Sequence, residues 1–118
     1  MKNKRTSWMR GFIHKRDGGK CQYCGTEGLD FQTGFVDHII PKSAGGTDDD
    51  SNLRLSCKSC NSRKGTQSVE QFRLLMMLAQ TPAYRVITAS QAQRLIEVGI
   101  DLKLPPPFRF HFEIAEAT

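Results

Sequence analysis

The sequence predicts an α+β fold in which a short two-stranded sheet and several helices surround a metal-binding core. Two stretches rich in β-branched and aromatic residues, 35–40 and 53–55, predict the strands. Apolar residues at helical spacing before and after them predict the helices. The cysteines form two C-x-x-C pairs whose spacing is typical of metal ligands, Cys21 with Cys24 and Cys57 with Cys60.

The elements before and within the hairpin follow from apolar periodicity and stop signals. Residues 5–16 predict a leading helix, which Asp17-Gly18-Gly19 should end. The first strand should end at Pro41, and the return strand should lead directly into a short helix over 58–64. The second cysteine pair therefore opens that helix.

The segment between the strands, 42–51, predicts a surface loop. It contains Gly45-Gly46 and the acidic run Asp48-Asp49-Asp50. Three adjacent carboxylates can also indicate a second metal site. A solvated loop tip is the preferred interpretation of this run.

Two further helices are predicted in the C-terminal part of the chain. Ser68 with Gln71, and Ser90 with Gln93, each fit a capping box ahead of an apolar stripe that should cover a core. Pro105-Pro106-Pro107 cannot continue a helix, so the tail after the prolines is expected to be extended.

The chain has few apolar residues and a basic net charge. The chain has 118 residues, 38% of them hydrophobic, and a net charge of +5. A small core is marginal without a disulfide or a metal. The charge is compatible with a polyanionic partner, although many proteins without such a partner share it. With no apolar run of about 18 residues and no signal peptide within residues 1–10, we expect a cytoplasmic protein that does not contact membranes.

The cysteines are interpreted as metal ligands because thiols stay reduced in the cytoplasm. Two C-x-x-C pairs can complete one tetrahedral zinc site, here with the 32 residues 25–56 between them. Two disulfides, or four thiols without a ligand, are the alternative. The sequence predicts a structural Zn²⁺ ion held by all four: Cys21, Cys24, Cys57 and Cys60.

The segment between the cysteine pairs carries residues suited to hydrolysing a phosphodiester. His38 can take a proton from water, since imidazole titrates near neutral pH. Asp37 offers a carboxylate oxygen and Asn61 an amide oxygen, which suit Mg²⁺ or Mn²⁺. Asn52 can hydrogen-bond the loop backbone and hold His38 in place.

One geometric requirement follows from the order of these residues. Asp37 and His38 are neighbours, and neighbours on a regular strand point to opposite faces. Both serve one site if the strand ends or bulges there, or if the ion and the water lie on different sides of the phosphate. The second arrangement suits an in-line displacement.

The motifs resemble those of the HNH endonuclease family. The resemblance covers roughly residues 10–65 and rests on these segments in order: Arg16 to Gly25, Asp37-His38-Ile39-Ile40-Pro41, Gly45-Gly46, Asn52-Leu53 and Cys57 to Gly65. It implies the ββα-metal (His-Me finger) fold, in which two antiparallel strands and a helix cradle one catalytic ion. Many members carry a histidine where this chain has Asn61, and some have asparagine. Compact members are common in phages and bacteria.

The resemblance implies an organisation and an activity. A basic N-terminal helix is expected over 1–19, a zinc-stabilised ββα nuclease core over 20–66, and a helical extension with the proline-containing tail over 67–118. The implied activity is metal-dependent cleavage of DNA, with double-stranded DNA as the expected partner. The alternative is an inactive, zinc-stabilised nucleic-acid-binding module. No protein partner is indicated.

Three cations on the short helix after the second strand are candidate contacts to DNA phosphates: Lys58, Arg63 and Lys64. Ordinary solvated charge on a helix face is the alternative interpretation.

Overall fold

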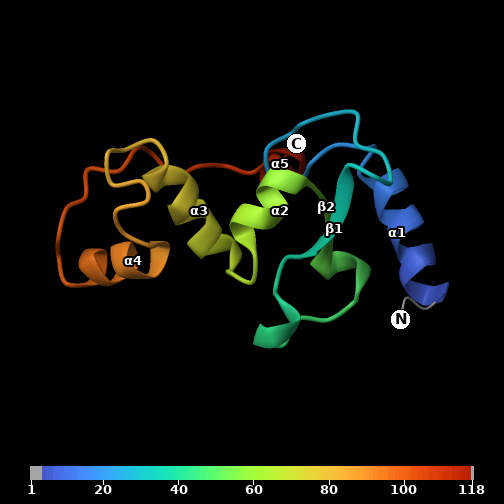
Figure 1. Cartoon of the computed structure of the whole chain (residues 1–118), viewed down its shortest axis with the longest axis horizontal. Helices are drawn as coiled ribbons and strands as arrows, with labels where there is room; N and C mark the ends of the chain where they lie inside the picture. Colours follow the sequence, from blue (N-terminus) through green and yellow to red (C-terminus); the bar gives the residue numbers. More distant parts are fainter. Residues whose placement is uncertain (1–3, 118) are drawn as a thin grey trace. The chain divides into compact units, whose positions relative to one another are not determined.

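The computed structural model describes the backbone of residues 4–117 and the side chains of residues 9–114. The described chain forms two compact units, each treated separately below (Figure 1). The first unit contains the residues up to 66 together with those from 110, and the second contains residues 67–109. Residues 1–3 of the predicted N-terminal segment lie outside the described residues.

A β-hairpin followed by a helix is the centre of the first unit. Strand β1 (Gly34–His38) pairs antiparallel with β2 (Leu53–Cys57), and α2 (Lys58–Lys64) follows at once. The helix has the predicted bounds, and the Cys57 sulfur caps it by accepting a hydrogen bond from the Cys60 amide. Strand β1 is shorter than predicted because the Asn52 side chain, in place of a strand partner, binds the backbone of Ile40.

The apolar core of the first unit lies between the hairpin and α1 (Lys4–Arg16). Ile13 of α1 and Leu53 and Leu55 of β2 are fully buried there. Three partly buried apolar residues pack around them: Met9, Leu29 and Val36. Such a small cluster supplies limited hydrophobic stabilisation, so this unit depends on further cross-links.

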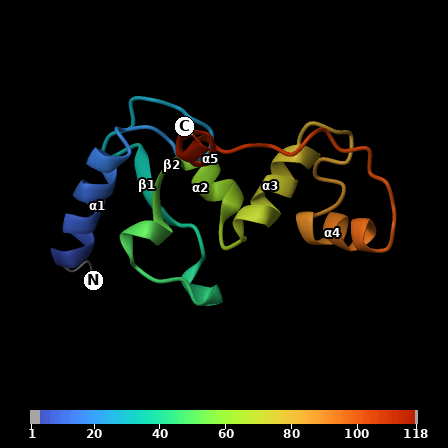
Figure 2. The same ribbon diagram turned by 180° about the vertical axis from the view of Figure 1, so that it is seen from behind.

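The C-terminal tail returns to the first unit as a helix, which corrects the predicted extended tail. Helix α5 (His111–Ala117) lies beside α2 and the hairpin in both views (Figures 1 and 2). The amides of His111 and Phe112 donate to the carbonyls of Tyr23 and Gln22 at 3.0 and 2.8 Å. Phe110 is fully buried and packs edge-to-face on Tyr23. These contacts join the tail to the first cysteine pair, whereas the sequence assigned it to the 67–118 extension.

The second unit contains α3 (Val69–Leu78) and α4 (Ala89–Glu97). The Ser68–Gln71 capping box of α3 forms as predicted. The box of α4 is instead made by Thr88 and Gln91, because the same residue pattern occurs two positions earlier than predicted.

The apolar stripe predicted for α4 does not form its buried face. Ala89 and Ala92 are buried, whereas Ile96 and Val98 are 44% and 72% exposed. The shifted start of the helix explains part of this difference, because small residues occupy its inward positions. Among the residues that the structure describes, no helix is long and apolar enough to cross a membrane.

Candidate active site and metal centre

The four cysteine sulfurs gather into one cluster, as their spacing predicts. All lie within 4.8 Å of one another, Cys24 Sγ is 3.7 Å from Cys57 Sγ, and none forms a disulfide. Four thiolates at about 2.3 Å from a zinc ion stand about 3.8 Å apart, so the cluster can hold a tetrahedral metal ion. Backbone amides of Cys24 and Cys60 point at the sulfurs of Cys21 and Cys57.

One thiol of the cluster is ready to act as a thiolate. A hydrogen bond from Cys60 lowers the pKa of Cys21 to about 4, despite the opposing effect of burial. The same hydrogen bond, together with burial, raises the pKa of Cys60. Burial also raises the pKa of Cys57. Metal binding must therefore displace protons from the remaining thiols, and the cluster holds a cation less tightly as the pH falls.

Asp37 is held from two sides at the end of β1. Its carboxyl group is 7% exposed, and its Oδ2 atom accepts a hydrogen bond of 2.5 Å from the Tyr23 hydroxyl. The same oxygen lies 3.1 Å from Lys64 Nζ. Burial, with a further contribution from the charge of Asp37, raises the pKa of Tyr23, so the phenol remains a donor. Among the described residues, both contacts fall on Oδ2, which leaves Oδ1 for another ligand.

Lys64 is part of this arrangement, which corrects its predicted role as a phosphate contact. Its side chain is fully buried, and Nζ donates to the His38 carbonyl at 2.8 Å as well as facing Asp37. A buried ammonium engaged by two oxygens does not reach a phosphate outside the protein. Its position in the last turn of α2 allows it to join the helix to the end of β1.

Replacing Lys64 by methionine is expected to destabilise the first unit by about 3–5 kcal/mol, because Asp37 is left as a buried charge without its ammonium partner. Lys58→Met is the matched control, since Lys58 is exposed on the same helix. Urea unfolding of both variants, in zinc-containing buffer without added Mg²⁺, measures the difference. Equal stability of the two variants would contradict this role.

His38 is the last residue of β1, which meets the geometric requirement for neighbouring residues at one site. The strand ends there, and the Ile39 amide donates to the Asn52 carbonyl at 2.9 Å. The imidazole Nε2 lies 2.8 Å from Asp48 Oδ1 in the loop between the strands. The acidic run is thus not wholly solvated, because Asp48 contacts both His38 and Lys42, whose Nζ lies 3.0 Å from Oδ2.

Asn52 fastens the start of the loop to its end. The side chain is buried, and its Oδ1 accepts a hydrogen bond of 2.8 Å from the Ile40 amide. Its Nδ2 donates to the carbonyls of Ile40 and Thr47 at 3.1 and 2.8 Å. These are the loop-backbone hydrogen bonds expected from the sequence.

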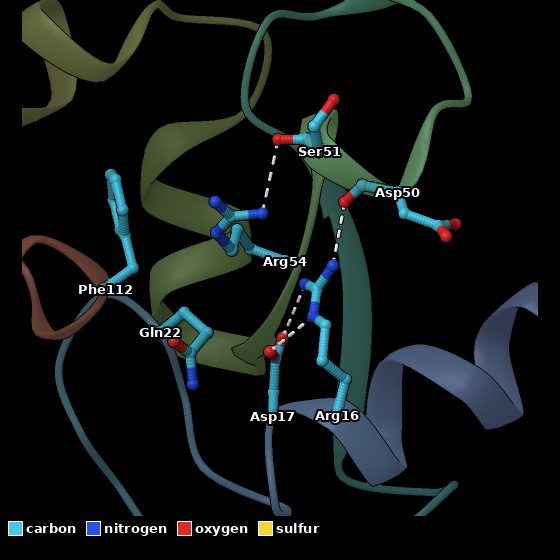
Figure 3. A pocket seen from close by; sticks show the side chains of 7 residues that line it. All are labelled: Arg16, Asp17, Gln22, Asp50, Ser51, Arg54 and Phe112. Atoms are coloured by element: carbon cyan, nitrogen blue, oxygen red, sulfur yellow. Dashed lines mark hydrogen bonds and ion pairs between the residues drawn. The ribbon is translucent and has the colours of Figure 1, made fainter. Parts of the chain in front are cut away.

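Two guanidinium groups hold the far end of the same loop. Arg16 donates to the carbonyl of Asp50, and Arg54 donates to that of Ser51 (Figure 3). Arg16 also donates to the Leu53 carbonyl. Both arginines line a hollow of about 360 Å³ on the surface of the first unit. Asp17 forms an ion pair with Arg16 in this hollow. Both guanidinium groups also donate hydrogen bonds to backbone carbonyls of the loop.

The remaining predicted site residues lie on α2. Asn61 is half-buried, and its side chain makes no hydrogen bond with another described residue. Lys58 and Arg63 are exposed on the same helix. Among cysteine, histidine and acidic side chains in the described chain, only the four cysteines form a group of three or more able to hold a metal.

The sequence did not reveal two contributors to the site. In the sequence, Tyr23 is one of the two residues between Cys21 and Cys24, and only its burial gives its hydroxyl a need for a hydrogen-bond partner. Asp48 is the first of three consecutive aspartates. The sequence alone does not show which of the three carboxylates contacts His38, because that depends on how the loop folds.

The fold and the placement of these residues define a class of protein. An antiparallel hairpin followed by a helix, with an aspartate and a histidine at the end of the first strand, is the ββα-metal arrangement expected from the sequence. With the clustered cysteines and flanking helices, the predicted fold class is confirmed.

One protein-family model matches part of the chain. Residues 21–67 match the model described as HNH endonuclease, so the resemblance seen in the sequence is confirmed over that segment. The match covers 47 of the 118 residues, and the matched family is described as one of endonucleases. No curated protein matches the chain.

A solved structure is similar to part of the chain. The crystal structure of the Type II-C Cas9 enzyme from Actinomyces naeslundii matches with a TM-score of 0.54 and 27% sequence identity. The match covers 62% of this chain and 8% of that one, so the chain spans a small part of the length of the Cas9 enzyme.

Proposed function

We propose that this chain is a metal-dependent DNA endonuclease in which His38 is the general base and Asp37 and Asn61 hold a single divalent ion. The observation that carries the proposal is the Asp37–His38 pair at the end of β1, engaged by Tyr23, Lys64 and Asp48. A binding protein needs no such arrangement of buried and paired polar groups around one strand end.

The proposed chemistry follows from what each side chain offers. His38 takes the proton from the attacking water, which raises the rate by about 10²–10⁴-fold for a well-placed base. A divalent ion would supply charge for the phosphate and leaving oxygens. Asp37 would hold it through Oδ1, since Tyr23 and Lys64 occupy Oδ2. Carboxylate and amide oxygens favour Mg²⁺ or Mn²⁺.

The cysteine cluster is proposed to hold a structural Zn²⁺ ion. Four thiolates in a tetrahedral arrangement suit zinc, and a fully coordinated ion leaves no open position for catalysis. Thiols kept for a metal fit a reducing compartment such as the cytoplasm. The zinc site and the catalytic site therefore have separate roles in this proposal.

Double-stranded DNA is the proposed substrate. The net charge of +5 favours a polyanion. Exposed Lys58 and Arg63 on α2 lie on the helix that also carries Asn61, so they are proposed to contact phosphates near the cleavage site. Lys64 is not included, because it is buried. An inactive zinc-stabilised nucleic-acid-binding module is the less favoured alternative.

Cleavage of a supercoiled plasmid tests the proposed function. The zinc-loaded protein is incubated with Mg²⁺, Mn²⁺ or no added divalent ion, and nicked and linear products are separated on a gel. Product that forms only with the added ion supports the nuclease. Absence of product with either ion, while the protein is folded and retains zinc, would favour the inactive binding module.

Asn61→His is expected to keep cleavage activity and to extend it to Ni²⁺ or Zn²⁺, because imidazole is a better ligand than an amide oxygen for these ions. Ser62→His is the control, since it places the same side chain at the exposed neighbouring position. Cleavage rates across a panel of divalent ions measure the effect. An unchanged metal preference would remove Asn61 from the proposed metal shell.

A further inference from the structure

We propose that Asp48 is a positioning residue for His38: its carboxylate binds the imidazole Nε2–H and thereby presents Nδ1 to the attacking water. The inference rests on the proposed function and deepens it, because it assigns a role to a loop carboxylate. It also specifies which ring nitrogen takes the proton.

The contact itself defines the hydrogen-bonding state of the ring. His38 Nε2 lies 2.8 Å from Asp48 Oδ1, and the two side chains are 29% and 39% exposed. A carboxylate can only accept, so the neutral imidazole must carry its hydrogen on Nε2. Its lone pair is then on Nδ1, which has no partner among the described residues. That nitrogen is the one able to accept a proton from water.

Asp48 is kept as a charged acceptor by its two partners. His38 binds Oδ1, and Lys42 Nζ lies 3.0 Å from Oδ2. The hydrogen bond with His38, followed by that with Lys42, holds the pKa of Asp48 below its usual value. The carboxylate is therefore available to His38 throughout the neutral range.

The loop backbone is anchored on both sides of Asp48. Asn52 binds the carbonyl of Thr47, the residue immediately before Asp48, at 2.8 Å. On the other side, Arg16 binds the Asp50 carbonyl at 2.8 Å (Figure 3). The position of the carboxylate is thus set by the folded loop, and Asn52 supports His38 partly by way of Asp48.

The neighbouring acids of the run do not share this contact. Asp49 Oδ2 accepts a hydrogen bond of 3.0 Å from Thr47 Oγ1, which keeps it within the loop. The Asp50 side chain is exposed and forms no hydrogen bond or ion pair with another described side chain. Asp50 therefore provides a matched control of the same residue type, two positions away.

The kinetic test compares Asp48→Asn and Asp50→Asn in steady-state cleavage of a DNA duplex with Mg²⁺. Asp48→Asn should lower kcat about 10- to 100-fold with KM within about twofold, because its amide can also donate to Nε2 and favour the wrong tautomer. The loss should be smaller than the ~10⁴-fold effect known for a buried triad carboxylate, since this pair is partly exposed. Asp50→Asn should match the wild type.

Folding controls accompany the kinetics. Zinc content and the thermal unfolding midpoint of Asp48→Asn should equal those of the wild type, so that a lower kcat reports on His38. Wild-type kcat in Asp48→Asn, or a change confined to KM, would overturn the inference while leaving the proposed nuclease intact.

A spectroscopic measurement tests the same contact without cleavage. Long-range ¹⁵N NMR of the wild type at a pH where the imidazole is neutral should find His38 with its hydrogen on Nε2, and Asp48→Asn should shift the tautomer balance. A wild-type His38 protonated on Nδ1 would overturn the inference whether or not the protein cuts DNA. If the wild type does not cut at all, the proposed function fails. In that case the tautomer of His38 still tests whether Asp48 binds the Nε2–H group.

Discussion

Replacing His38 by alanine is expected to abolish metal-dependent cleavage, with a rate loss of about 10²–10⁴-fold. No other described side chain combines a position at the end of β1 with an available ring nitrogen. The His38 side chain belongs neither to the cysteine cluster nor to the hydrophobic core. The hydrogen bond between His38 and Lys64 is made by the His38 backbone carbonyl, which alanine keeps. The variant should therefore fold, bind zinc and bind DNA as the wild type does.

The measurement is a plasmid time course with wild-type protein, His38→Ala and His111→Ala at equal concentration. His111 is a suitable control because its recorded tertiary hydrogen bond is made by its backbone amide, at the start of α5. If His38→Ala and the wild type cut at the same rate, His38 is not the base and the activity resides elsewhere or in a contaminant.

The second large effect is expected for Cys57→Ser, which should lose the structural ion and unfold the first unit. Structural zinc contributes about 10–16 kcal/mol in small zinc-dependent folds, while whole domains are stable by only about 5–15 kcal/mol. The three fully buried residues of the core cluster cannot compensate for such a loss. Cys57 also caps α2, so the helix that carries Asn61 and Lys64 is directly affected.

Zinc content and circular dichroism measure this outcome, with Ser59→Ala as the control. Ser59 is exposed in the same helix, between the two cysteines of the pair. A zinc-free Cys57→Ser protein with wild-type secondary structure and unfolding midpoint would show that the cluster is not structural.

The hairpin and its helix were predictable because their signals are local. Each signal lies within one short stretch of the sequence: the apolar residues of a single strand, the two cysteines of a single C-x-x-C pair, or the residues that bound α2. The return of the tail was not predictable in this way. The pairing of Phe110 with Tyr23 joins residues far apart in the chain, and the prolines before the tail hid its helical end.

In the candidate site too, some residues could be predicted from the sequence and others depend on contacts between distant parts of the chain. Asp37, His38 and Asn52 could be selected because hydrolysis requires those residue types. The burial of Lys64 was not apparent, since a lysine in an Arg-Lys-Gly sequence has the composition of a solvated helix end. Its long apolar stem can cross the interior, and only the folded chain brings the Asp37 carboxylate and the His38 carbonyl to its end.

The return of the tail has a consequence for what counts as the smallest working form of this protein. Residues 67–109 interrupt the first unit in sequence, because its last segment resumes at Phe110. Tyr23, which binds Asp37, packs on that resumed segment. A fragment ending at residue 66 would keep every motif of the family match except its final residue, yet it would lack the aromatic support behind Asp37. The smallest form that keeps this support for Asp37 is therefore discontinuous in sequence, because it needs the segment that begins at Phe110 as well as the motifs before residue 66.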